Sequence, residues 1–144
     1  MRALLDINVI IALLDPDHDF HRRAHEWWGI NAKKGWASCP LTQNGVVRIL
    51  SHPAYNPGRS LTPGVVIALL QAFTAGTDHR FCPDTVSLLD ETAIHCGKIL
   101  GPRQITDLYL LALARKSDCR FVTFDESINR DAIPDTDAEY LVVV

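Results

Sequence analysis

Short apolar segments alternate with helical segments along the whole chain, and this alternation most strongly limits the fold. We expect strands at Arg2–Leu5, Gly35–Ser38, His79–Cys82, Arg120–Thr123 and Tyr140–Val144. No two-residue turn of the Asn-Gly type separates any two of them. Strands that are joined through helices run parallel to one another. The sequence therefore predicts an α/β fold, doubly wound, with a central parallel sheet of about five short strands flanked by helices.

The segments between the strands have the apolar periodicity and the end signals of helices. Thr62 followed by Pro63 is typical of a helix start, because Thr caps the first turn and Pro fits its first position. Thr42 and Thr106 are predicted to cap two further helices. The expected helices, with a break near Leu89 in the fifth, are Val9–Leu14, His18–Trp28, Thr42–Leu50, Pro63–Gly76, Thr85–Leu100 and Thr106–Lys116.

Length and charge limit the classes of protein to which the chain can belong. Residues 1–144 are expected to form a single domain with an ordinary hydrophobic core. The longest apolar runs are far below the roughly 20 residues of a membrane span, and no signal-peptide pattern occurs. We therefore expect a cytoplasmic protein that makes no use of a membrane. The net charge of −3 excludes a uniformly basic coat for nucleic acid, so RNA must be bound through a local patch or a metal ion.

The four cysteines form neither a CxxC pair nor a zinc-ligand spacing. We expect buried, reduced thiols. Cys39 and Cys82 fall at the ends of two predicted strands that are neighbours, so a disulfide between them stays open as an alternative.

Three aspartates fall at positions that a doubly wound sheet brings to one edge. Asp6 and Asp125 follow the carboxyl ends of two strands, and Asp107 opens the helix before the second of these. Ligands of α/β sheets bind at this edge. Carboxylates gathered there repel one another, and a divalent cation with oxygen ligands, Mg²⁺ or Mn²⁺, offsets that repulsion. Helix capping is the alternative for each aspartate taken singly, and it is favoured for Asp107.

Four segments together resemble the PIN-domain family and, within it, the VapC toxins of bacterial toxin–antitoxin pairs. The resemblance covers nearly the whole chain, through LLDINV from Leu4, CPLTQNGVVRIL from Cys39, ITDLYLLALA from Ile105 and FVTFD from Phe121. It implies one PIN-like domain that acts as a Mg²⁺- or Mn²⁺-dependent endoribonuclease. The RNA substrate would be transfer RNA or ribosomal RNA, cut to leave a 5′-phosphate. The resemblance also implies a cognate antitoxin protein and a homodimer formed through the early helices.

Residue by residue, the resemblance makes Asp6, Asp107 and Asp125 the catalytic residues and the metal ligands. Asn8 and Thr123 match polar residues that flank these acids. We expect one or two metal ions to activate a water molecule and to neutralise charge on the phosphate.

One position departs from the family pattern, because Gln43 stands where family members carry a glutamate. An amide offers a metal only a neutral oxygen, so we expect a site of three carboxylates that binds metal more weakly. Thr106 is expected to support the site from the start of its helix. Arg48 follows Asn44 by one helical turn and is a candidate contact for an RNA phosphate, with a structural ion pair as the alternative.

Other α/β classes also place acids at strand ends. A phosphoaccepting receiver domain needs two acids after strand one, whereas only Asp6 is present. A haloacid-dehalogenase-type phosphatase needs Asp-x-Asp, whereas Asn8 occupies the second position. The strongest competing hypothesis is a PIN-like protein that binds RNA or its antitoxin without cutting, because Gln43 replaces the glutamate.

The helix predicted after Asp15 carries further residues of interest. His21 and His25 stand at i, i+4 but lack an HExxH pattern, so we interpret them as part of a solvated helix face. Arg22 and Arg23 are interpreted as surface charges that can also guide RNA phosphates. Trp27 and its neighbour Trp28 are expected to pack against the core or a partner rather than to stack on bases.

Overall fold

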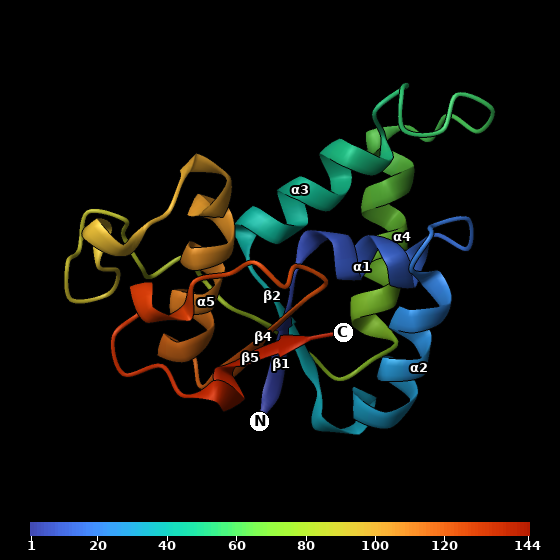
Figure 1. Ribbon diagram of the computed structural model, residues 1–144. Coiled ribbons are helices and arrows are strands. Elements are labelled where there is room, and N and C mark those ends of the chain that lie inside the picture. The colour runs from blue at the N-terminus through green and yellow to red at the C-terminus, as the bar shows by residue number, and fades with distance from the viewer.

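The central sheet has five parallel strands in the order β3-β2-β1-β4-β5, which confirms the predicted fold class (Figure 1). The computed structural model describes residues 1–144. Every strand lies within one residue of its predicted bounds. The strands are β1 (Arg2–Leu5), β2 (Trp36–Ser38), β3 (His79–Phe81), β4 (Cys119–Thr123) and β5 (Leu141–Val143).

Helices cover both faces of the sheet. They are α1 (Ile7–Leu14), α2 (His21–Asn31), α3 (Pro40–Leu50), α4 (Pro63–Ala75) and α5 (Ile105–Lys116). Figure 1 shows α5 on one side of the sheet and α1, α2 and α4 on the other. A sheet covered in this way is buried on both faces, which agrees with the buried apolar residues Ala3–Leu5 of β1 and Phe121 and Val122 of β4.

Two hydrophobic cores hold the sheet between its helices. Successive side chains of a strand point to opposite faces, so β1 contributes to both cores. Leu4 packs with Phe121 and the leucines of α5 in one core. Leu5 packs with Val9 and Trp36 in the other. All of these side chains are almost completely buried, and each apolar side chain contributes about 1.5–3 kcal/mol to stability. The strand ends that carry the aspartates are therefore firmly placed.

The prediction of an N-cap at Thr62 is confirmed, whereas those at Thr42 and Thr106 are wrong. The Thr62 side chain accepts a hydrogen bond from the backbone N–H of Val65. Helix α3 begins earlier than predicted, at Pro40, and Thr42 lies in its first turn, where its hydroxyl accepts a hydrogen bond from the Cys39 N–H.

Helix α5 also begins before its predicted cap. A short 3₁₀ turn, Pro102–Gln104, runs directly into the helix and leaves Thr106 exposed in the first turn. No side chain caps this end. Thr106 therefore lies inside the first turn of α5 and does not cap the helix.

The prediction of a helix at Thr85–Leu100 is wrong. This stretch consists of turns with only one short 3₁₀ turn, Cys96–Lys98. The Ser87 hydroxyl accepts a hydrogen bond from the Leu89 N–H, and the Asp90 carboxylate accepts two from Thr92. Such local side-chain bonds compete with the helical backbone pattern, which is why apolar spacing alone misled the prediction.

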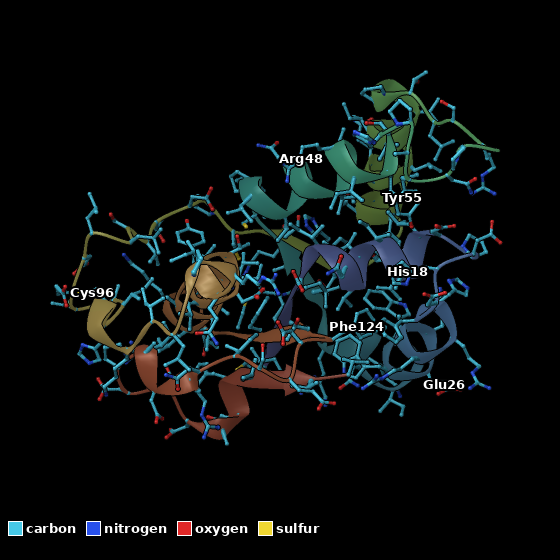
Figure 2. The ribbon with its side chains drawn as sticks, turned by 45° about the horizontal axis from the view of Figure 1, so that its top comes forward. His18, Glu26, Arg48, Tyr55, Cys96 and Phe124 are labelled. Carbon is cyan, nitrogen blue, oxygen red and sulfur yellow. The ribbon has the colours of Figure 1, made fainter.

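The cysteines are all free thiols, so the alternative of a Cys39–Cys82 disulfide is not realised. Cys39, Cys82 and Cys119 are buried as expected, and Cys96 is exposed at the outer end of the molecule (Figure 2). None of the helices has the length and the apolar character that crossing a membrane requires.

Candidate metal centre at the sheet edge

Asp6 lies at the point where the strand order reverses. β2 and β3 lie on one side of β1, and β4 and β5 lie on the other. Asp6 directly follows β1, and its backbone N–H donates to the carbonyl of Val122 in β4 at 2.9 Å. Crevices at such switch points are where open α/β sheets bind ligands.

The Asp6 carboxylate is fixed by two hydrogen bonds. One oxygen accepts from the Ile7 N–H at 2.6 Å, which makes Asp6 the N-cap of α1. The other oxygen accepts from the Thr123 hydroxyl at 2.9 Å. Only 6% of Asp6 is exposed. The capping alternative is therefore confirmed for Asp6, and the same carboxylate is also bonded to the end of β4 through Thr123.

Asp125 is held by a turn that follows β4. One of its carboxylate oxygens accepts hydrogen bonds from the Ser127 N–H at 2.7 Å and the Ser127 hydroxyl at 2.6 Å. These bonds hold the pKa of Asp125 below its usual range. The Asp125 N–H donates to the Thr123 hydroxyl oxygen at 3.1 Å. Thr123 thus links the backbone of one aspartate to the side chain of Asp6.

Asp107 completes the set from the first turn of α5. It is half-buried, and burial raises its pKa to about 6, with further contributions from the negative charges of Asp6 and Asp125. Burial also raises the pKa of Asp6, against the effect of its two hydrogen bonds, and the charge of Asp125 adds to the increase. The three carboxylates therefore sense one another electrostatically, as expected for acids that share one edge.

The three carboxylates do not form a complete metal-binding site. No set of three or more His, Cys, Asp or Glu side chains lies close enough to hold a metal ion. Their oxygen atoms are nevertheless the donors that Mg²⁺ and Mn²⁺ prefer, and their mutual repulsion is what a cation relieves. The donor atoms have the chemistry that a divalent ion needs, and an ion held there would have to keep several water ligands.

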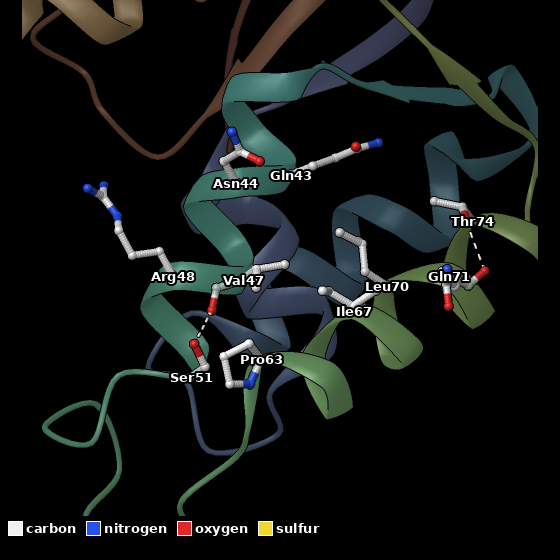
Figure 3. A pocket seen from close by; sticks show the side chains of 10 residues that line it. All are labelled: Gln43, Asn44, Val47, Arg48, Ser51, Pro63, Ile67, Leu70, Gln71 and Thr74. Carbon is white, nitrogen blue, oxygen red and sulfur yellow. Dashed lines mark hydrogen bonds between the residues drawn. The ribbon is translucent and has the colours of Figure 1, made fainter.

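Gln43 does not face the three aspartates. Its side-chain amide donates to the Ser38 hydroxyl at 3.0 Å, and that hydroxyl is 2.8 Å from the imidazole of His79. Figure 3 shows the Gln43 side chain and that of Asn44 pointing to different sides of α3. Gln43 belongs to the side of α3 that faces α4.

Asn44, the neighbour of Gln43 in α3, lines a basin on another side of the helix. This basin of about 490 Å³ is also lined by Ile7 and Thr106, the sequence neighbours of Asp6 and Asp107, and by Asp84 and Arg48. Arg48 makes no ion pair, so the structural alternative considered for it is not realised. Its guanidinium group is exposed at the rim. Asn8 is exposed on the outer side of α1 and contributes no hydrogen bond to the site.

Asp84 was not selected as a site residue from the sequence. It follows β3 after Pro83, so the same rule that selected Asp6 and Asp125 applies to it. Burial and the neighbouring Asp84 carboxylate raise the pKa of Tyr109, in α5, to about 12. Asp84 is thus the one acid that lines the basin, and it follows β3 rather than belonging to α3.

The other residues singled out in the sequence have structural roles. His21 and His25 donate to the carbonyls of Ala12 and Leu13 at 2.7 and 3.0 Å, so they satisfy carbonyls at the end of α1. This corrects the expectation of a purely solvated face. Trp28 packs on aromatic rings of the core, as expected.

Comparison with known proteins agrees with this geometry. The model of the PIN domain family matches residues 3–133. The chain is 46% identical to "Ribonuclease VapC44" of Mycobacterium tuberculosis over 144 residues, all of both chains. It is 43% identical to "Ribonuclease VapC38" of the same organism over 128 residues, 88% of this chain and 86% of the relative.

A solved structure shares the fold. The crystal structure of Mycobacterium tuberculosis VapC20, described as a sarcin-ricin loop cleaving toxin, matches with a TM-score of 0.60. The match covers 93% of this chain and 98% of that one, at 14% sequence identity. The chain therefore belongs to the PIN domain family. Within that family it belongs with the VapC ribonucleases, as the resemblance of the four segments implied.

The raised pKa of Asp107 gives a testable pH dependence. In the unfolded chain an aspartate titrates near 3.9. Between about pH 4 and about 6 the folded protein therefore binds more protons at Asp107 than the unfolded chain does, and this residue's contribution to stability falls as pH rises. We expect Asp107→Asn to remove that loss, so that the variant gains stability over the wild type from pH 4 to 6. Thermal melting in EDTA measures the difference in stability between the variant and the wild type. A difference that stays constant from pH 4 to 6 would contradict the prediction.

Proposed function

We propose that this protein is a Mg²⁺- or Mn²⁺-dependent endoribonuclease, the toxin of a toxin–antitoxin pair, which hydrolyses phosphodiester bonds in RNA. One observation carries the metal-dependent chemistry, namely the buried Asp6 carboxylate at the switch point, electrostatically coupled to Asp107 and Asp125. Membership of the VapC ribonucleases supports RNA as the substrate. Transfer RNA and ribosomal RNA are the candidate targets.

The residues of this site have separate proposed roles. Asp6, Asp107 and Asp125 are the proposed metal ligands, and a bound cation supplies an activated water and neutralises charge on the phosphate. Thr123 and the Ile7 N–H hold Asp6 in one orientation. The Ser127 hydrogen bonds keep Asp125 ionised.

The rim of the site is proposed to position the RNA. Arg48 and Thr106 line the basin, and Thr106 directly precedes the proposed ligand Asp107. Arg48 has no carboxylate partner, so it is available to hold a phosphate group that flanks the cut.

A protein partner is proposed to cover the neighbouring groove. A groove of about 570 Å³ lies between α3 and α4, with Val47, Ile67 and Leu70 in its lining (Figure 3). It shares Asn44 and Arg48 with the basin, so a peptide in the groove reaches the site. We assign it to the antitoxin and assign a homodimer contact to the early helices. The chain is proposed to act in the cytoplasm as one PIN-like domain, residues 1–144.

An assay with and without metal tests this function. The purified protein is incubated with RNA and Mn²⁺, with RNA and Mg²⁺, and with RNA in EDTA, and the ends of the products are identified. We expect cleavage with 5′-phosphate ends in the presence of metal and none in EDTA. Equal cleavage in EDTA would overturn the metal-dependent mechanism.

A protein that binds without cutting is the second candidate. It is favoured by the lack of an acid from α3 and by the open arrangement of the three aspartates. In that case Mn²⁺ binds, as followed by calorimetry, while the RNA remains intact. Metal binding together with cleavage would exclude this candidate.

A further inference from the structure

We propose that Gln104 is a positioning residue, which joins the segments of Asp107 and Asp125 and so sets the affinity of this pair for a divalent cation. The inference rests on the proposed metal-dependent function and deepens it, because it gives a role to a residue outside the set of ligands. Gln104 ends the 3₁₀ turn Pro102–Gln104, directly before α5.

The side-chain amide of Gln104 bridges two segments of the chain. Its nitrogen donates a hydrogen bond to the carbonyl of Ser127 at 2.8 Å, and its oxygen accepts one from the Leu100 N–H at 3.3 Å. Both partners are backbone groups, one only an acceptor and the other only a donor, so they determine which way round the amide lies. Gln104 therefore connects the segment before α5 to the turn after β4.

Ser127 extends this connection to Asp125. Its N–H and its hydroxyl both donate to one carboxylate oxygen of Asp125, at 2.7 and 2.6 Å. Ser127 thus bonds to Asp125 through its two donors and to Gln104 through its carbonyl. Asp125, Glu126 and Ser127 are all exposed, so packing against the core contributes little to holding them. The position of the Asp125 carboxylate therefore depends on these hydrogen bonds.

Gln104 and Asp107 belong to one continuous helical path. The 3₁₀ turn runs directly into α5, and residues three apart on a helix lie on the same face. The face that carries Asp107 therefore also carries the side chain that reaches the turn of Asp125. Burial and, after it, the charges of Asp6 and Asp125 raise the pKa of Asp107 to about 6, so the two bridged carboxylates sense each other.

The bridge matters for metal binding because the carboxylates of Asp107 and Asp125 repel each other. In the absence of a cation, this repulsion favours movement of the exposed turn away from α5. A divalent ion needs its oxygen ligands at bonding distance, so a turn that is already held near α5 binds the ion at a lower cost in ordering. Residues that orient metal ligands typically change metal affinity or activity by about 10- to 100-fold.

The variant Gln104→Met tests this role. Methionine is of similar length and removes both hydrogen bonds, and it is a good helix former at a position that makes no capping bond for α5. We expect Mn²⁺ to bind about 10- to 100-fold more weakly in a calorimetric titration. Half-maximal RNA cleavage should need a correspondingly higher Mn²⁺ concentration. In the metal-free protein, the Ser127 N–H should exchange faster with solvent, because its turn has lost a hydrogen bond.

The variant Asn129→Leu is the matched control. The Asn129 amide donates to the carbonyl of Lys98 at 3.0 Å, so it joins the same two stretches of chain by the same kind of hydrogen bond. Its side chain is bonded to neither Ser127 nor Asp125. We expect both variants to lower the melting temperature in EDTA to a similar extent. Only Gln104→Met should weaken Mn²⁺ binding and speed exchange at Ser127.

The possible results distinguish this inference from the proposed function. If the wild type binds Mn²⁺ and Gln104→Met binds it equally well, the positioning role is overturned and the metal-dependent function stands. An equal loss of Mn²⁺ affinity in both variants would also overturn the role, because general loosening of the structure would then explain the effect. A wild type that binds no Mn²⁺ and cuts no RNA would overturn the proposed function, and the positioning role with it.

Discussion

Replacing Asp6 with asparagine is expected to reduce RNA cleavage by more than about 100-fold while it raises the melting temperature. Outer-shell partners of metal ligands already change affinity or activity by about 10- to 100-fold, and Asp6 is proposed as a direct ligand. Activity is followed by cleavage of RNA in Mn²⁺, and stability by thermal melting in EDTA.

The gain in stability follows from the environment of Asp6. Burial raises the pKa of this carboxyl, so at neutral pH its charge opposes folding. Asparagine removes the charge and keeps both contacts. Its oxygen accepts from the Ile7 N–H, and its amide donates to the Thr123 hydroxyl, which accepts in place of donating. A residue whose charge costs stability is typical of a functional site.

A matched control shows whether the effects on cleavage and stability are specific to Asp6 or arise from replacing any aspartate of this protein. Asp118 is exposed and lies in the turn before β4, at the opposite edge of the sheet. Its backbone φ of 52° is tolerated by asparagine, so Asp118→Asn should keep both activity and stability. Normal cleavage by Asp6→Asn, or a lower melting temperature, would show that Asp6 is only a helix cap.

The fold was largely predictable because its signals are local and repeated. The strands are short segments that alternate with helices, and the lack of hairpins leaves only the parallel arrangement. The topology then fixed which residues share an edge, so Asp6, Asp107 and Asp125 could be grouped without coordinates. Their grouping is reflected in the raised pKa values of Asp6 and Asp107.

Two kinds of feature were not predicted. They depend on the direction in which a side chain points and on local side-chain hydrogen bonds that compete with helix formation. The stretch after Thr85 has apolar spacing, but the Ser87 and Asp90 hydrogen bonds favour turns. Gln43 and Asn44 are neighbours on one helix, and sequence alone does not say which of them faces the acids. The contact of Gln43 with Ser38 depends on the position of β2 below α3. Asp84 obeyed the strand-end rule and was missed because the resemblance emphasised other segments.

A pair of amide-to-acid substitutions on α3 tests where a fourth carboxylate belongs. Asn44→Asp and Gln43→Glu each add one charge and keep the shape of the side chain. Asn44 lines the basin beside Ile7 and Thr106, so its replacement should tighten Mn²⁺ binding by about tenfold, because ligand charge tunes the affinity of oxygen sites. Gln43 is bonded to Ser38, so Gln43→Glu should leave Mn²⁺ affinity unchanged.

The two variants should also differ in stability without metal. Asn44 is exposed, and a new charge there mainly adds repulsion toward the acids of the basin, which salt screens. The Gln43→Glu change removes the amide donor to Ser38, a buried residue, so this variant should melt lower in EDTA. Calorimetric titration with Mn²⁺ and thermal melting measure both effects. Tighter metal binding by Gln43→Glu alone would mean that Gln43 turns toward the aspartates, and that the sequence-based assignment of the missing glutamate to this position was right.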